Sequence, residues 1–502
     1  MKKLALLLVV FIQVSFLKAQ NITDAVRYSS ENLDGTARFI SMGGAFGALG
    51  GDLSAIKLNP ASSAVFLTNQ AGLTFNLGAY KNNSEYLGEN NSYRNNNFDL
   101  NQAGVVFVFN NSNEAEAVSR MTFGITYERT NSFKNKWRAA GTSDESLSHW
   151  FLDLAQGVPL DLFTLQSGES LNSLYNYLGY ANEGFNNTRL QTAYLGYEAF
   201  IFDAVDPDDM ANTTYTSNIS GNSFGHRYEN YERGTNGKVS FNGGISIKDD
   251  IYLGINLNSH FLDFRQSTGT RESIGGNSLI REIDFRNYLD TRGEGFSMQI
   301  GGIARLGDVF RVGLSYESPT WMRIEEETQQ FLRTYHSEFG DIIVNPRVTN
   351  VYPTYSLRTP GKFNGGLAAV FGTSGLLSFD YSYKDFSNTK FTSSGFGQAN
   401  QQINDLLKAV STYRLGGEYR WKDLSLRAGF RYEESPYKNN TIGNLRGYSA
   451  GLGYNFGAFQ MDFAYDWHQR DFDQELLHTG FSNTASVKNK MSNYVLSFIF
   501  AL

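Results

Sequence analysis

The stretch YSAGLGYNFGAFQMDFAYDW, residues 448–467, shows the pattern that decides the fold. An apolar or aromatic side chain stands at every second position, first from Tyr448 to Phe456 and then from Phe459 to Trp467. Successive side chains of a β-strand point to opposite faces, so this spacing predicts two strands that each have one apolar face. Only a two-residue break separates the two runs, which predicts an antiparallel hairpin.

Hairpins of this kind recur to the C-terminus, and fourteen alternating runs can be counted. The connections between them alternate strictly, with seven long polar loops and six short turns. Bacterial transmembrane barrels have an even number of antiparallel strands, short periplasmic turns and long extracellular loops. The sequence therefore predicts an all-β fold, a 14-stranded antiparallel transmembrane β-barrel. The runs cover residues 73–79, 104–109, 121–127, 239–247, 251–257, 296–304, 310–316, 363–371, 377–383, 413–421, 424–432, 448–456, 459–467 and 494–502.

The second face of the runs carries charged side chains, such as Arg431, Asp462 and Asp466. A charge on the lipid face costs about 2–4 kcal/mol at the bilayer midplane, so these side chains are expected to face a polar lumen. The apolar runs often end in Tyr or Trp, as at Tyr383 and Trp421, which fits aromatic girdles at the membrane interfaces.

The composition fits strands that separate lipid from water. Aromatic residues make up 15% of the 502, yet the mean hydropathy is −0.35. No cysteine is present, which excludes a disulfide framework and a cysteine-based metal site. The net charge of −7 comes without a basic stripe, so nucleic acid is not an expected partner. The histidines lack metal spacing and no Ser-His-acid arrangement stands out, so we expect neither an enzyme nor a cofactor.

The N-terminal MKKLALLLVVFIQVSFLKAQ has the features of an export signal. Lys2 and Lys3 precede an apolar segment, and Ala19 is a small residue suited to cleavage. The alternative is a transmembrane helix, for which the segment is short, since a span needs about 20 apolar residues. We expect residues 1–19 to be a signal peptide and the mature chain to be exported.

The segment SMGGAFGALGGDLSAIKLNPASSAVF, residues 41–66, has neither strand alternation nor a long helical stripe. With an even number of strands, both ends of the barrel lie on the periplasmic side, so this segment can fold up into the lumen. We therefore expect residues 20–69 to form a hatch and residues 70–502 to form the barrel. A short helical stretch is expected over residues 52–58, ended by the turn at Asn59-Pro60. The glycine spacing does not match a nucleotide-binding loop; small residues instead permit close backbone packing.

Several motifs resemble the FadL/TodX family of outer-membrane transporters for hydrophobic compounds. The resemblance rests on MGGA at residues 42–45, NPA at 59–61, and four further echoes in the right order. It runs from about Gly35 to the C-terminus, and the long segment 130–235 is where no family motif matches. The further echoes are VGLSYESP (312–319), LRTPGKFNGGL (357–367), LRAGFRYEESP (426–436) and GYSAGLGYNFG (447–457).

The resemblance implies passive uptake of long-chain fatty acids or other hydrophobic small molecules across the bacterial outer membrane. It also implies that the hatch gates passage and that the ligand leaves sideways through the barrel wall into membrane lipid. The C-terminal Phe498–Leu502 is similar to the assembly signal of outer-membrane proteins, so the barrel-assembly machinery is an expected partner during biogenesis. The hatch and gate residues predicted are Met42, Gly43, Gly44, Ala45, Phe46, Asn59, Pro60 and Ala61.

Ligand contacts are predicted in three places, each with a plainer alternative. In the hatch, apolar side chains either line a pocket or pack against the wall. Residues 145–156 predict an amphipathic helix that either captures ligand or packs on neighbouring loops. Lumen arginines pair either with a ligand carboxylate or with Glu418 and Glu433. Gly124 is the candidate for the lateral exit, because glycine in a strand often marks a bulge. The ligand candidates are Phe39, Leu49, Phe66, Trp150, Phe151, Leu154, Arg414 and Arg427.

Other interpretations stay open from the sequence. The protein could be a general diffusion porin, in which the hatch is only a constriction. It could also be a surface adhesion or receptor protein that uses its long loops. The aspartates of DAVDPDD, residues 203–209, offer oxygen ligands for calcium without the spacing of an EF-hand.

Overall fold

The computed structural model describes residues 22–113, 116–181, 183–477 and 483–502. The predicted signal peptide, residues 1–19, lies outside this part of the chain. The rest confirms a closed 14-stranded antiparallel β-barrel, in which the last strand pairs with the first from Gln70↔Ala501 to Glu85↔Ser486. The strands in order around the wall are β1 (Gln70–Tyr86), β2 (Glu89–Asn110), β3 (Val118–Ser132), β7 (Phe224–Ile247), β8 (Ile251–Ile274), β9 (Ile280–Leu306), β10 (Phe310–Glu317), β15 (Lys362–Phe371), β16 (Gly375–Asp385), β18 (Ala409–Trp421), β19 (Leu424–Glu433), β20 (Leu445–Asn455), β21 (Phe459–Glu475) and β22 (Thr484–Ala501).

The two faces of the wall differ as the alternation predicts. Outward-facing side chains such as Ile300, Leu314 and Leu367 are each more than half exposed. Their charged neighbours on the other face, including Asp462 and Asp466, are buried inside the barrel. The inside is therefore the polar lumen expected from the cost of charge in lipid.

The short turns, the start of β1 and the end of β22 all lie at the same end of the barrel, called here the turn end. The opposite end is called here the loop end. The prediction of a long loop is wrong at two places there, where the structure has a short connection. Leu87 and Gly88 alone join β1 to β2, with φ of 48° and 79°, and residues 275–279 join β8 to β9. Beyond the apolar band these strands no longer place apolar side chains regularly on the outer face, so the alternation is lost while the backbone ladder continues.

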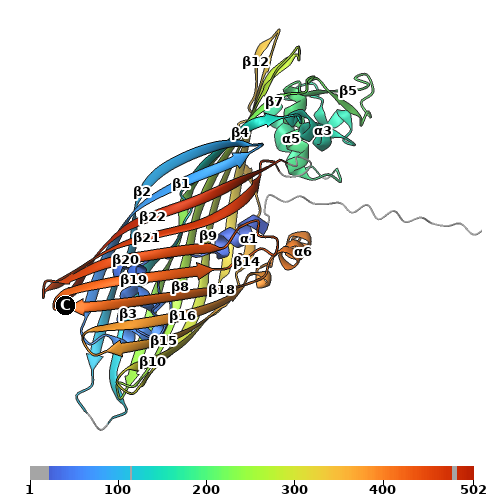
Figure 1. Ribbon diagram of the computed structural model, residues 1–502. Helices are drawn as coiled ribbons and strands as arrows, with labels where there is room; N and C mark the ends of the chain where they lie inside the picture. The colour runs from blue at the N-terminus through green and yellow to red at the C-terminus, as the bar shows by residue number, and fades with distance from the viewer. Residues whose placement is uncertain (1–21, 114–115, 182, 478–482) are drawn as a thin grey trace, which may run out of the picture.

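The remaining loop-end connections add short strands and a helical cap (residues 144–223), which lies at the end opposite the C-terminus (Figure 1). The predicted helix over 145–156 is confirmed as α3 (Leu147–Ala155), capped by the Ser146 side chain. None of the described helices has the length and apolar character to cross a bilayer. The other elements are β4 (Asn135–Ser143), η3 (Leu160–Phe163), α4 (Leu171–Leu178), α5 (Asn187–Glu198), β5 (Phe202–Ala204), β6 (Tyr215–Ser217), β11 (Trp321–His336), β12 (Gly340–Val344), β13 (Asn350–Val351), β14 (Tyr355–Arg358), η4 (Phe386–Asn388), β17 (Lys390–Phe391) and α6 (Gly397–Leu406).

The N-terminal segment lies inside the barrel as a hatch of four short helices: α1 (Ile22–Ser29), α2 (Ala37–Ser41), η1 (Leu53–Lys57) and η2 (Pro60–Val65). The helical stretch predicted over 52–58 is η1. Asp52 starts it, because its side chain accepts a hydrogen bond from the Ser54 N–H, and Asn59 starts η2 in the same way.

Candidate functional site

The hatch is fixed to the wall by side chains of the lumen face that reach its backbone. Asn256 Nδ2 donates to the Ile56 carbonyl at 2.9 Å, and Arg311 Nη1 donates to the Leu49 carbonyl at 2.8 Å. On the opposite wall, Ser497 Oγ accepts from the Ala37 N–H at 2.7 Å. Backbone groups that helices this short leave unpaired are thereby satisfied by the barrel.

A ring of wall glycines, called here the glycine belt, lets the hatch backbone approach the strands. A Cβ atom on any of them would lie only 2.0–2.8 Å from a hatch atom. The hatch glycines were predicted to permit close packing; the structure shows that the wall contributes glycines as well. The belt consists of Gly244, Gly254, Gly301, Gly313, Gly366, Gly416, Gly429 and Gly451.

The predicted gate residues are buried where the hatch meets this belt. Gly43 and Gly44 have φ of 64° and 77°, a conformation that favours glycine. Gly43 N–H donates to Ser449 Oγ on β20 at 3.1 Å. Asn59 Nδ2 donates to the Gly47 carbonyl and to the Gly302 carbonyl of β9. The remaining predicted gate residues, Met42, Ala45, Phe46, Pro60 and Ala61, are all buried around these contacts.

The apolar ligand candidates of the hatch lie in packed clusters. Phe39 and Leu49 belong to a cluster that includes Leu376 and Val495 of the wall. Phe39 also contacts Phe46, with ring centroids 5.5 Å apart, and Phe66 packs with Val106 of β2.

The candidates of α3 are equally enclosed. Trp150, Phe151 and Leu154 are buried in the core of the helical cap. Both aromatic rings contact Phe285 of β9, each with centroids 5.4 Å apart. In this structure α3 packs on the extended barrel strand.

Arg427 lies in a buried ladder of ion pairs. Its Nε donates to Glu418 Oε2 at 2.6 Å and its Nη1 to Asp462 Oδ1 at 2.6 Å. Glu418 also accepts from Arg38 of the hatch at 2.9 Å, so the ladder joins hatch to wall. The other lumen candidate, Arg414, donates to Ser382 Oγ at 2.6 Å.

A seam without backbone pairing opens between β2 and β3. Their ladder runs only from Asn110↔Arg120 to Gln102↔Glu128, although β2 reaches back to Glu89 and β3 continues to Ser132. Above the last pair, β2 is hydrogen-bonded as a strand only to β1, and β3 and β4 only to β7, among the residues that the structure describes. Because Phe98 and Leu100 of β2 point outward there and are exposed, the part of the seam next to the ladder lies within the apolar band.

The hatch covers this seam from the inside. Asn32 N–H donates to the Thr130 carbonyl of β3 at 2.7 Å, and Asn101 Nδ2 of β2 donates to the Gly35 carbonyl at 2.8 Å. Between them, Asp34 pairs with Arg129 of β3 at 2.7 Å. Residues 32–35, called here the latch, therefore contact both unpaired strands.

Across the seam itself, Asp99 of β2 pairs with Arg129 at 2.8 Å and with Lys134 at 2.5 Å. The predicted exit residue Gly124 lies within the regular ladder, opposite Val106 of β2 and Asn242 of β7.

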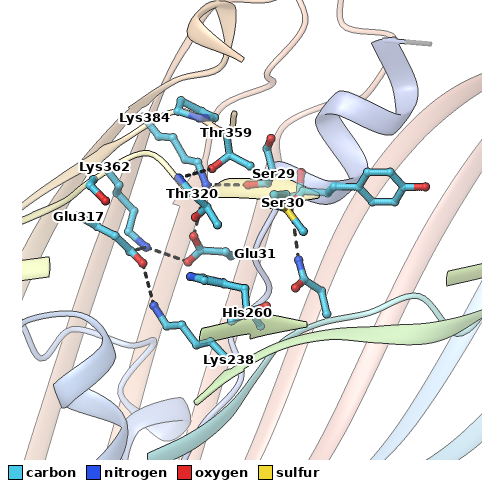
Figure 2. A pocket seen from close by; sticks show the side chains of 16 residues that line it. Ser29, Ser30, Glu31, Lys238, His260, Glu317, Thr320, Thr359, Lys362 and Lys384 are labelled. Carbon is cyan, nitrogen blue, oxygen red and sulfur yellow. Dashed lines mark hydrogen bonds and ion pairs between the residues drawn. The ribbon is translucent and has the colours of Figure 1, made fainter. Parts of the chain in front are cut away.

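A small polar cavity lies beside the latch (Figure 2). Three lysines from three strands converge on it: Lys238 of β7, Lys362 of β15 and Lys384 of β16. Glu317 of β10 pairs with Lys238 at 2.9 Å and with Lys362 at 3.2 Å, and Glu31 of the hatch lies among the lysines in Figure 2.

The pKa values of two hatch carboxyl groups, Asp52 and Glu31, shift in opposite directions. Burial raises the pKa of Asp52, and nearby Arg38 with hydrogen bonds from Thr36 and Ser54 offsets only part of the rise. Burial alone would also raise the pKa of Glu31. The ammonium groups of the three cavity lysines outweigh it and hold the pKa of Glu31 well below its ordinary value.

The aspartates of 203–209 make local hydrogen bonds. Asp203 accepts from Asn218 Nδ2, and Asp206 and Asp209 accept from backbone N–H groups within their own turn. No group of three or more acidic or histidine side chains is placed to hold a metal ion in the described part of the chain.

The lysine cavity and the latch were not predicted from the sequence. The sequence does indicate on which face of the wall each lysine lies, because each is next to an outward-facing residue. These pairs are Lys238 with Val239, Lys362 with Phe363, and Lys384 with Tyr383. Period 2 places all three on the lumen face. Their convergence depends on the register of distant strands.

Comparison with known proteins agrees with this architecture. The model of the family described as outer membrane protein transport protein (OMPP1/FadL/TodX) matches residues 198–490. A FadL homologue from Pseudomonas aeruginosa is 13% identical with a TM-score of 0.55, over 94% of this chain and 99% of that one. A mutant of the TodX monoaromatic hydrocarbon channel is 11% identical with a TM-score of 0.52, over 94% and 100% of the two chains. At these identities the solved structures show a common fold. No protein with a curated description matches in sequence.

Proposed function

We propose that this chain, which belongs to the outer membrane protein transport protein family (OMPP1/FadL/TodX), admits long-chain fatty acids or similar hydrophobic small molecules passively. In this proposal the ligand enters from the loop end, the hatch controls its passage, and it leaves sideways into the outer-membrane lipid.

The observation that carries the proposal is the seam between β2 and β3 with the latch behind it. A membrane barrel normally pairs every strand along its length, because unpaired backbone groups are costly in lipid. Here the gap faces the apolar band, and side-chain contacts of Asp99 and the latch cover it. These contacts are separable without breaking a strand ladder. We therefore place the proposed exit at this seam, four residues along β3 from Gly124.

The packed hatch favours this function over a general porin. A diffusion porin needs an open, water-filled lumen, whereas here the hatch side chains from Ala37 to Ala64 are almost all buried against each other or the wall. Gating by Met42–Phe46 and Asn59–Ala61 is part of the proposal. The tight contacts of these residues with the glycine belt favour small shifts of the hatch, with larger movement in the latch.

The test is a reversible tether across the seam. Cysteines replacing Asp99 and Arg129 are joined by a bis-maleimide whose spacer contains a disulfide, which is selective because the native chain has no cysteine. Uptake of a radiolabelled long-chain fatty acid into proteoliposomes should stop and should return when reductant cleaves the tether. The matched control joins Phe109→Cys to Met121→Cys, a directly opposed pair in the intact β2–β3 ladder, and should leave uptake unchanged. Undiminished uptake through the tethered seam would exclude lateral exit there. Swelling of the proteoliposomes in small sugars would favour the porin instead.

A further inference from the structure

The wall residues that line the lysine cavity carry more positive charge than negative charge. Lys238, Lys362 and Lys384 are largely buried, and the wall supplies one carboxylate against them, that of Glu317. Buried charges require partners, because the cost of removing them from water is several kcal/mol per ion. The wall alone therefore leaves an anion site.

Glu31 supplies the missing anion from the hatch. One carboxylate oxygen lies 2.8 Å from Lys362 Nζ and the other lies 3.3 Å from Lys384 Nζ (Figure 2). Lys384 also donates to the Ser29 carbonyl at 2.6 Å. The two oxygens of Glu31 thus occupy the positions beside Lys362 and Lys384 that the carboxylate of a ligand would need. A ligand carboxylate can pair with both lysines only if Glu31 leaves.

The helix before Glu31, α1, has an apolar face that packs on the wall. Ala25, Val26 and Tyr28 of α1 belong to a buried cluster with Phe264 and Met322 of the wall. Met322 and Tyr28 also line the lysine cavity, so the apolar cluster and the anion site are continuous. The apolar face of α1 and the carboxylate of Glu31 thus lie next to each other along one segment of the hatch.

We propose that the lysine cavity is the recognition site for the carboxylate head of a long-chain acid, and that Glu31 is an internal substitute which the substrate displaces. This inference rests on the proposed transport function and narrows its substrate to amphiphiles with a single anionic head. Glu31 directly precedes the latch, Asn32–Gly35. Displacing Glu31 breaks the ion pairs that hold the chain beside the latch to β15 and β16, which couples substrate binding to opening.

The first test compares two ligands of equal chain length in non-ionic detergent: hexadecanoate and hexadecan-1-ol. Glu31→Gln should bind hexadecanoate about fivefold to tenfold more tightly than the native protein, which is the scale of one displaced charge-assisted hydrogen bond. Its affinity for hexadecan-1-ol should not change. Lys362→Met should lose the preference for the acid over the alcohol. The matched controls are Glu89→Gln and Lys488→Met, exposed residues outside the cavity, and both should bind as the native protein does.

The second test follows the latch. A spin label on Ser30→Cys, beside Glu31, should gain mobility when hexadecanoate is added and should stay immobile with hexadecan-1-ol. Equal affinities of Glu31→Gln and native protein for hexadecanoate, or a label that responds to both ligands alike, would overturn the inference while leaving transport intact. Failure of the proposed function is distinct, because native protein would then bind and transport neither ligand and the seam tether would have no effect.

Discussion

The glycine belt makes Gly313→Ala the most informative single change. A methyl group on Gly313 would lie 2.0 Å from the carbonyl oxygen of Gly47 and 2.7 Å from its carbonyl carbon. These are backbone atoms, which no rotamer change can move. Overpacking of this kind costs about 1–3 kcal/mol, and the absence of a flexible neighbour places this site at the upper end.

A shift of the hatch relieves this strain, because the hatch can move without breaking the hydrogen bonds between the barrel strands. Moving Gly47 inward breaks its N–H bond to Asp380 and the bond from Asn59 to its carbonyl. A shift of about 3 kcal/mol raises the population of the displaced hatch roughly 150-fold. We therefore expect Gly313→Ala to leave the barrel folded and the hatch unseated near Gly47.

The assay is thiol labelling at Leu49→Cys, which is buried beside this contact. In this background, labelling by a soluble maleimide should accelerate about 100-fold on adding Gly313→Ala. The control is Gly365→Ala on the neighbouring strand. Its methyl would meet only Leu314 Cδ2, at 3.6 Å, and removing a glycine stabilises by about 0.4–1 kcal/mol through the unfolded chain. Equal labelling rates in the two variants would refute the argument that the belt seats the hatch.

Three further changes test other parts of the structure. Glu418→Gln should lower the free energy of unfolding by about 3–5 kcal/mol, because it leaves the buried guanidinium groups of Arg38 and Arg427 without their shared partner; an unchanged denaturation midpoint in detergent would contradict this. Asp52→Ala removes the cap of η1 and should weaken the seated hatch by about 1 kcal/mol, seen as faster proteolysis within the hatch at equal barrel stability. Phe285→Ala should loosen the helical cap by about 3–5 kcal/mol while the barrel keeps its melting point; loss of both together would show that cap and barrel unfold as one unit.

The barrel could be predicted from sequence because lipid imposes a simple rule on each strand. Every run that crosses the apolar band must alternate, so rows such as Leu314 and Leu367 identify strands directly. Above the band the rule no longer applies. The β1–β2 turn at Leu87-Gly88 and the extended parts of β8 and β9 were not predicted, because there the outer face is no longer a regular row of apolar side chains.

The candidate site was harder to predict from the sequence than the barrel, for a different reason. Motif and composition located the hatch, and its gate residues lie against the wall in the structure. The seam could not be predicted, because the residue types of Asp99–Gln102 are those of an ordinary strand. They do not indicate whether β3 pairs with this part of β2. The lysine cavity needs the register of three distant strands, which no local pattern specifies. Conversely, the α3 aromatics read as an amphipathic helix from sequence and form the interior of a cap.

The closure of β22 on β1 has a consequence for assembly. The hatch precedes β1 directly, and it touches strands from β3 to β22, so its full set of wall contacts exists only when β22 has paired with β1. Pairing Gln70 with Ala501 joins residues from opposite ends of the sequence, which is the slowest kind of contact to form. Seating of the hatch is thus tied to completion of the barrel: the N-terminal segment can make all of its contacts only after the two ends of the sequence have met.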